Sequence, residues 1–123
     1  MFTVKRLLHP EIFQGIDRHK NYFEGWYFKC VSQNTNNIMA FIPGISYGNS
    51  PRDSHSFIQV LDASRNRSGY FPFESSDFSC AEDRLELKLG RNTFSTNGMT
   101  VSLQNRDMAY EGHLAFENPV PFP

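Results

Sequence analysis

Residues 21–31, with the sequence NYFEGWYFKCV, constrain the fold of this chain more than any other stretch. Five of the seven positions 22–28 are aromatic, a composition typical of a β-strand. Glu24, Gly25 and Lys29 interrupt the run, although an ordinary buried strand avoids such residues. Two interpretations follow. The stretch is either a core strand, in which Gly25 marks a bulge or a close backbone approach, or a strand that carries a functional site.

Position parity indicates which side chains of this stretch lie together. In a regular strand one face carries Glu24, Trp26, Phe28 and Cys30, and the other carries Gly25, Tyr27, Lys29 and Val31. Glu24 and Lys29 therefore oppose each other unless a bulge at Gly25 resets the register. Two roles remain open for Glu24: an acid inside an aromatic-lined cavity, or a partner in an ion pair with Lys29 or with an arginine of the next strand.

The rest of the chain also predicts strands. Apolar and polar residues alternate over 85–89, 99–103 and 108–116, which is the period of a half-buried strand. Further strands are expected at 38–46, 55–62 and 70–73, and turns rich in Asn, Gly and Ser separate them. We therefore predict an all-β fold of seven or eight antiparallel strands, arranged as a lipocalin-like barrel or a sandwich, with little helix.

Two of these expected strands have unusual features. Pro43 stands in the middle of 38–46 and cannot donate a ladder hydrogen bond, so this strand is expected to bend or to lie at a sheet edge. The strand 55–62 has apolar residues at both parities, which suits a strand buried on two sides.

Length, charge, the N-terminal sequence and the cysteines limit the classes of protein to which this chain can belong. The 123 residues suit one β domain over 1–123, and residues 118–123 form a Pro-rich end or linker. A net charge of -1 disfavours nucleic acid and polybasic membrane attachment. The N-terminus resembles neither a secretory signal nor a membrane span. Cys30 and Cys80 are far apart in sequence, which favours reduced thiols in a cytoplasmic protein.

Common catalytic and metal-binding motifs are absent from the sequence. It contains no GxSxG, Walker, GxGxxG or HExxH pattern. The four histidines do not form pairs at i, i+2 or i, i+4, so no metal site is predicted. His113 lies on the polar parity of its strand and is expected to face solvent.

The run Phe23-Glu24-Gly25-Trp26-Tyr27-Phe28-Lys29 resembles the FEGWY(F/Y)K signature near the start of tocopherol cyclases. The preceding His9-Pro10, the hydrophobic strand 38–42 and the G-x-N-x-F pattern within 87–95 are also similar to that family. Its members are two to three times longer, so the chain is similar to their N-terminal part. Unpaired strand edges would then favour self-association.

The resemblance implies a reaction and a site. Tocopherol cyclases add a phenol hydroxyl of a prenylated hydroquinone across the nearest double bond of the prenyl tail, without a cofactor. Glu24 is the implied proton donor, with Asp62 and His55 as weaker candidates, and aromatic faces would stabilise the developing cation. The expected ligand-binding residues are Tyr22, Trp26, Tyr27, Phe28, Phe41, His55 and Phe57.

Two alternatives to a cyclase remain open at this point. A non-catalytic, lipocalin-like carrier would use a similar cavity to bind a hydrophobic small molecule. A structural interaction module would fill its interior with the aromatic side chains. A cavity that contains a carboxyl group favours the enzyme, an apolar cavity without an acid favours the carrier, and a filled interior favours the module.

Overall fold

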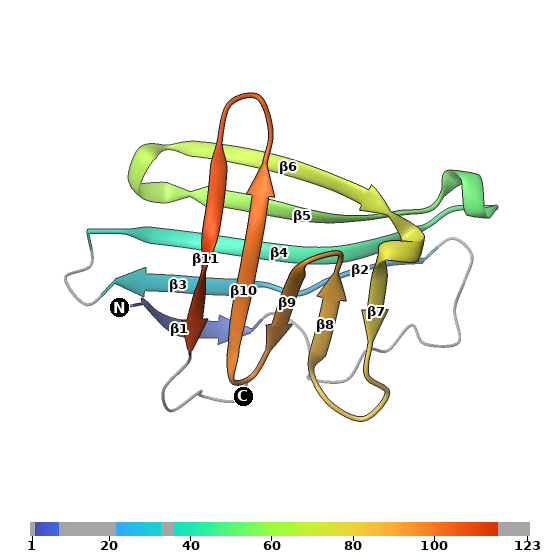
Figure 1. Cartoon of the computed structure of the whole chain (residues 1–123), viewed down its shortest axis with the longest axis horizontal. Coiled ribbons are helices and arrows are strands. Elements are labelled where there is room, and N and C mark those ends of the chain that lie inside the picture. The colour runs from blue at the N-terminus through green and yellow to red at the C-terminus, as the bar shows by residue number, and fades with distance from the viewer. Residues whose placement is uncertain (1, 8–21, 33–35, 116–123) are drawn as a thin grey trace.

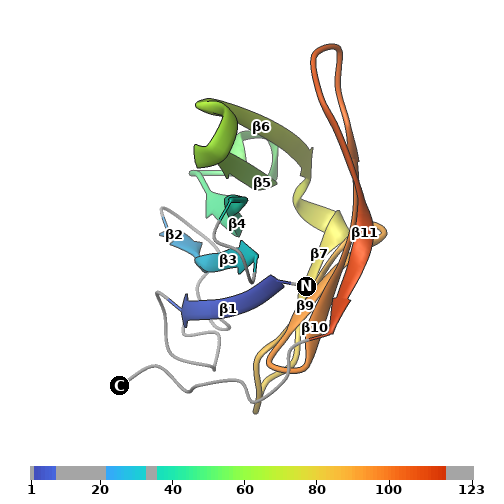
Figure 2. The ribbon, with the colours of Figure 1, turned by 90° about the vertical axis from the view of Figure 1, so that its left-hand side faces the viewer.

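The computed structural model describes residues 2–7, 22–32 and 36–115, which fold into two antiparallel sheets packed face to face (Figures 1 and 2). The all-β prediction is confirmed in its sandwich form, because the two sheets of the described residues do not join into a closed barrel. Helix in these residues is limited to short 3-10 turns at Pro51–Asp53, Ala63–Arg65 and Ser75–Asp77. Strands of one sheet run across those of the other (Figure 1).

The first sheet has the order β1-β3-β4-β5-β6, and β2 also pairs with β4. Its strands are β1 (Phe2–Leu7), β2 (Tyr22–Gly25), β3 (Phe28–Ser32), β4 (Ile38–Tyr47), β5 (His55–Asp62) and β6 (Arg67–Glu74). The second sheet has the order β11-β10-β9-β8-β7. Its strands are β7 (Phe78–Cys80), β8 (Glu86–Leu89), β9 (Asn92–Ser95), β10 (Gly98–Gln104) and β11 (Ala109–Ala115).

The described residues thus form more strands than the seven or eight predicted. One reason is that the aromatic stretch forms two strands, since β2 and β3 are separated by Trp26 and Tyr27. A second reason is that residues 2–7 form a strand that pairs with β3, although no strand was predicted there. β3 and β4, which follow each other in the sequence, pair as antiparallel neighbours.

Pro43 explains why the aromatic stretch is divided. β4 pairs with β2 through Gly44 and with β3 through Phe41, and Pro43 lies between these two partners. Its carbonyl oxygen accepts a hydrogen bond from the Trp26 N–H at 2.9 Å. In an antiparallel sheet the N–H and C=O of one residue point to the same neighbouring strand. Since the Pro43 carbonyl points to Trp26, the position where Pro43 lacks an N–H also faces the break between β2 and β3, and not β5. β4 is therefore a central strand, so of the two predicted outcomes, a bend or an edge position, the edge position is wrong.

The side chains that position parity placed together on one face of the aromatic stretch lie inside the sandwich. Glu24, Trp26, Phe28 and Cys30 are all buried. The Trp26 ring stacks on Phe78 of β7 with centroids 6.0 Å apart, and the Phe28 ring contacts Phe94 of β9 at 5.3 Å. Each such buried side chain contributes about 1.5–3 kcal/mol of hydrophobic stabilisation. The remaining core is formed by apolar residues of both sheets: Ile45, Ile58, Val60, Phe71, Leu85, Leu87, Leu89, Met99, Val101 and Leu103.

The G-x-N-x-F pattern has a structural role here. Gly90 takes a φ of +59° in the turn between β8 and β9, a conformation that favours glycine. The buried Asn92 side chain donates to the Leu89 carbonyl at 3.1 Å and accepts from the Ser102 N–H at 2.7 Å. Phe94 then enters the core. The pattern ties the β8–β9 hairpin to β10.

We predict that Gly44→Ala destabilises the fold. A Cβ at this position would overlap the Phe57 ring and lie 2.8 Å from the Glu24 carbonyl oxygen. Overpacking of this kind costs about 1–3 kcal/mol of unfolding free energy, which urea titration can measure. Gly112→Ala is the control, because a Cβ there meets nothing within 4 Å. Equal stability of the two variants would contradict the packing described here.

Candidate functional site

A group of titratable side chains meets at the end of the sandwich formed by β2, β4 and β7. Glu24 of β2 is only 3% exposed and pairs with Ile45 of β4. Tyr47 lies two residues beyond Ile45, so it is the diagonal neighbour of Glu24 on the same face. We call Glu24, Tyr47 and Cys80 the Glu24 cluster.

Electrostatics link the members of the Glu24 cluster. Burial raises the pKa of the Cys80 thiol to about 11, and the nearby charges of Glu24 and Glu82 add to this shift. Burial also raises the pKa of the Tyr47 hydroxyl, with a smaller contribution from Cys80. At neutral pH the cluster therefore contains one carboxyl group beside a neutral phenol and a neutral thiol. The fully buried Trp26 and its stacking partner Phe78 lie next to these groups in sequence, and they fill the adjoining interior.

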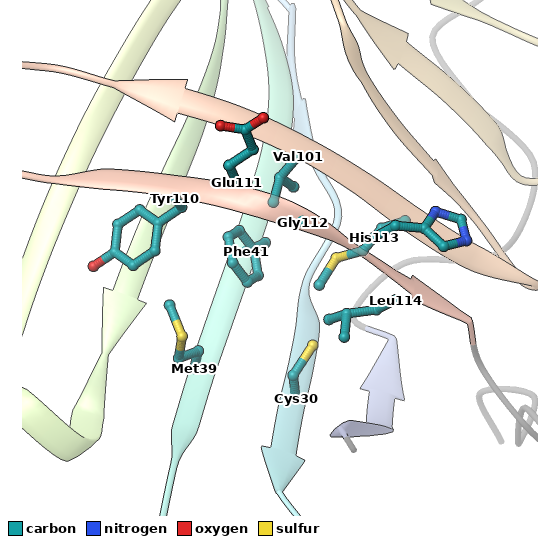
Figure 3. A pocket seen from close by; sticks show the side chains of 10 residues that line it. Cys30, Met39, Phe41, Val101, Tyr110, Glu111, Gly112, His113 and Leu114 are labelled. Carbon is teal, nitrogen blue, oxygen red and sulfur yellow. The ribbon is translucent and has the colours of Figure 1, made fainter.

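A separate apolar cavity lies between the sheets near β11 (Figure 3). Its volume is about 180 Å³. Figure 3 shows the Cys30, Met39 and Phe41 side chains of the first sheet facing the strands of the second sheet. The Glu111 and His113 side chains point away from the first sheet. The residues around the cavity are Cys30, Met39, Phe41, Met99, Val101, Tyr110, Glu111, Gly112, His113 and Leu114.

The inward wall of this cavity is uncharged at neutral pH. Burial raises the pKa of the Cys30 thiol to about 12, so this group stays protonated. The edge of the Tyr110 ring packs against Phe41, with centroids 6.2 Å apart. Within the described part of the chain, the buried Tyr110 hydroxyl has no hydrogen-bond partner. On the outer face, the His113 Nδ1 and the Thr100 hydroxyl are hydrogen-bonded at 2.9 Å.

The acid and the cavity occupy different parts of the interior. Glu24 and Cys30 are on the same face but six positions apart, which corresponds to roughly 20 Å along an extended chain. Trp26 and Phe28 lie between them and are fully buried. A molecule bound beside Cys30 is therefore separated from the Glu24 carboxyl by packed aromatic rings.

The ligand-binding residues expected from the sequence are dispersed in the structure. Phe41 lines the cavity. Trp26 and Phe28 fill the core, and Tyr27 lies between β2 and β3 with partial exposure. The side chain of Tyr22 lies outside the described residues.

His55 and Phe57 lie on the outer face of the first sheet and not in the cavity. The His55 Nε2 is 2.7 Å from the Tyr70 hydroxyl, and Phe57 stacks between Phe23 and Tyr70. Asp62, the other weak candidate for the acid, is engaged at the β5–β6 turn. Its carboxylate accepts from the Arg65 N–H and side chain, each at 3.2 Å.

Most cavity residues were not identified from the sequence. Met99 and Val101 of β10 and Tyr110, Gly112 and Leu114 of β11 lie at the apolar parity of their strands. Their alternation predicted that they face inward, but it did not predict where the two sheets leave space. That depends on how the strands of one sheet cross those of the other.

Comparison with known proteins identifies no relative. No family model matches the chain, and no curated protein or solved structure matches it either. No helix among the described residues is long and apolar enough to span a membrane. Over the same residues, no group of three His, Cys, Asp or Glu side chains could hold a metal ion.

Proposed function

We propose that this protein binds a hydrophobic small molecule in the cavity between its sheets. The observation that supports the proposal is the apolar space beside Cys30, Phe41 and Leu114, into which none of the described lining residues points a charged group. Its volume of about 180 Å³ exceeds the roughly 150 Å³ of an engineered apolar cavity that binds benzene. The space thus accommodates one aromatic ring or one short branched alkyl unit.

The walls of the cavity suit an adaptable binding site. Met39 and Met99 contribute flexible, polarizable side chains, which adjust to ligands of different shape. Gly112 leaves further space, since a Cβ at that position would meet no atom within 4 Å. Pockets that bind drug-sized ligands measure about 300–1,000 Å³, so a longer molecule would insert one end and leave the rest at the cavity mouth near β11. A prenylated phenol has this form.

Leu114→Trp is expected to weaken binding. The indole would occupy the space between β11 and β3, and we expect at least a tenfold increase in the Kd for geranyl hydroquinone, measured by isothermal titration calorimetry. Ala109→Trp is the matched control, because Ala109 lies on the exposed face of the same strand. Binding that is equally strong in both variants would exclude the cavity as the site, as would no binding to the unmodified protein.

A second candidate function is the cyclisation of a prenylated hydroquinone, as the resemblance to tocopherol cyclases implies. The specific observation in its favour is that Glu24 is buried on the same face as Trp26. In this reaction a protonated Glu24 would donate its proton to the alkene, the phenol oxygen would bond to the resulting tertiary cation, and the phenol proton would return to Glu24. The Trp26 face would stabilise the cation.

This candidate requires a rearrangement of the interior. The substrate must reach the Glu24 cluster, and the Trp26–Phe78 stack now fills the adjoining space. Tyr47 lies on the inward face diagonal to Glu24 and could pass the phenol proton between substrate and carboxylate. Binding in the cavity and catalysis at the cluster are therefore separate proposals.

Glu24→Gln tests the catalytic proposal. The amide preserves the size of the side chain but cannot donate the proton, so chromanol formation from geranyl hydroquinone should fall about a hundredfold or more. Glu86→Gln makes the same chemical change at an exposed position of β8 and should leave turnover unchanged. Full activity of a folded Glu24→Gln variant would exclude Glu24 as the acid.

We also propose that the protein self-associates through its outer strands in a reducing, cytoplasmic setting. In the described residues the outermost strands are β1 and β6 in the first sheet and β7 and β11 in the second, and Cys30 and Cys80 are free thiols. Light scattering at high micromolar concentration should show a dimer or a larger species. A monomer at that concentration would contradict self-association.

A further inference from the structure

The outer edge of β11 presents backbone groups that β10 does not use. Ser102 of β10 is paired with Glu111, and its N–H donates to the Asn92 Oδ1 of β9 at 2.7 Å, so it points away from β11. Residues directly opposite each other in an antiparallel pair point their N–H and C=O groups either towards each other or both outwards. The N–H and C=O of Glu111 therefore point away from β10, and alternation places those of His113 in the same direction.

β11 also lacks the features that protect sheet edges from pairing with another chain. Among the other outermost strands of the described residues, β1 shifts register between Val4 and Leu7, β6 contains Pro72, and β7 has only three residues. Irregular register, proline and short length each hinder the addition of a strand. β11 is seven residues long, keeps one register with β10 along its whole length and contains no Pro, Lys or Arg. Its edge is therefore open to an added strand.

The first sheet provides a floor for a strand added at this edge. β4 and β5 cross behind β11 and continue past its free edge (Figure 1). A second folded domain beside β11 would meet this part of the first sheet, whereas a single extended segment would lie on it. The apolar cavity lies between β11 and this floor, with Met39, Phe41 and Leu114 in its walls. Inward-facing side chains of an added strand would therefore reach an apolar space.

We propose that β11 binds an extended peptide as an added antiparallel strand. The outward N–H and C=O groups of Glu111 and His113 would bond to the peptide backbone, and an extended chain matches their spacing. Peptide residues opposite Tyr110, Gly112 and Leu114 would face the cavity and are expected to be apolar. Gly112 leaves room for the central one, since a Cβ there meets nothing within 4 Å. Residues opposite Glu111 and His113 would face solvent and are expected to be polar, with Lys opposite Glu111.

The test is the fluorescence anisotropy of a dye-labelled heptapeptide, Lys-Val-Thr-Leu-Lys-Val-Lys, titrated with the full chain. Paired antiparallel, this peptide places its Leu opposite Gly112 and its second Lys opposite Glu111. N-methylation of its third and fifth residues removes the N–H groups that face β11, so binding should weaken about tenfold or more. N-methylation of its second and sixth residues alters N–H groups that face away from β11 and should leave the affinity unchanged.

Two variants of the chain test the same edge. His113→Pro removes an outward N–H without removing a hydrogen bond to β10, and it should weaken peptide binding about tenfold or more. His113→Ala retains this N–H and should bind the peptide as the unmodified chain does. The inference concerns the sheet edge and does not require that the cavity binds a small molecule.

The alternatives give distinct results. No binding of the peptide, or equal affinity of the two methylated peptides, would overturn the proposal. A dimer that excludes the peptide, and that His113→Pro dissociates, would assign the edge to a second copy of the chain and would also overturn it. The methylated peptides leave the protein unchanged, so their comparison does not depend on the folding of any variant.

Discussion

The contact of Trp26 and Phe28 with Phe78 and Phe94 is the interaction on which the sandwich depends. These two pairs join the aromatic stretch to β7 and β9 of the second sheet, and neither Trp26 nor Phe28 is exposed. A close-packed aromatic centre leaves no space for a ligand, so the candidate catalytic and binding groups lie towards the two ends of the interior. The Glu24 cluster occupies one end and the apolar cavity the other.

The separation of the Glu24 cluster from the apolar cavity determines what each candidate function requires. A cavity beside Cys30 with uncharged walls favours binding of a hydrophobic molecule, whereas acid catalysis requires the same molecule to approach Glu24 through the aromatic centre. Glu24 is a buried carboxyl group on the inward face of the aromatic stretch, and the catalytic proposal assigns it as the acid for this reason.

The sequence predicted the fold class and the inward face of the aromatic stretch, since alternation of apolar and polar residues depends only on local geometry. It could not predict that Pro43 lies in a central strand, because this depends on which neighbour its missing N–H faces. His55 and Phe57 were expected near the ligand, but β5 is apolar at both parities and so its pattern did not identify the inner face. The cavity depends on the crossing of two sheets, which no local pattern encodes.

The aromatic stretch turns its inner face towards a dry interior, and Trp26 reports on this directly because it is the sole tryptophan of the chain. An indole shielded from water emits at shorter wavelength than one in solution and is poorly accessible to acrylamide. We expect blue-shifted emission and weak acrylamide quenching in the native protein, both reversed in urea. Native emission and quenching equal to those of the unfolded chain would contradict the packing of the two sheets through Trp26.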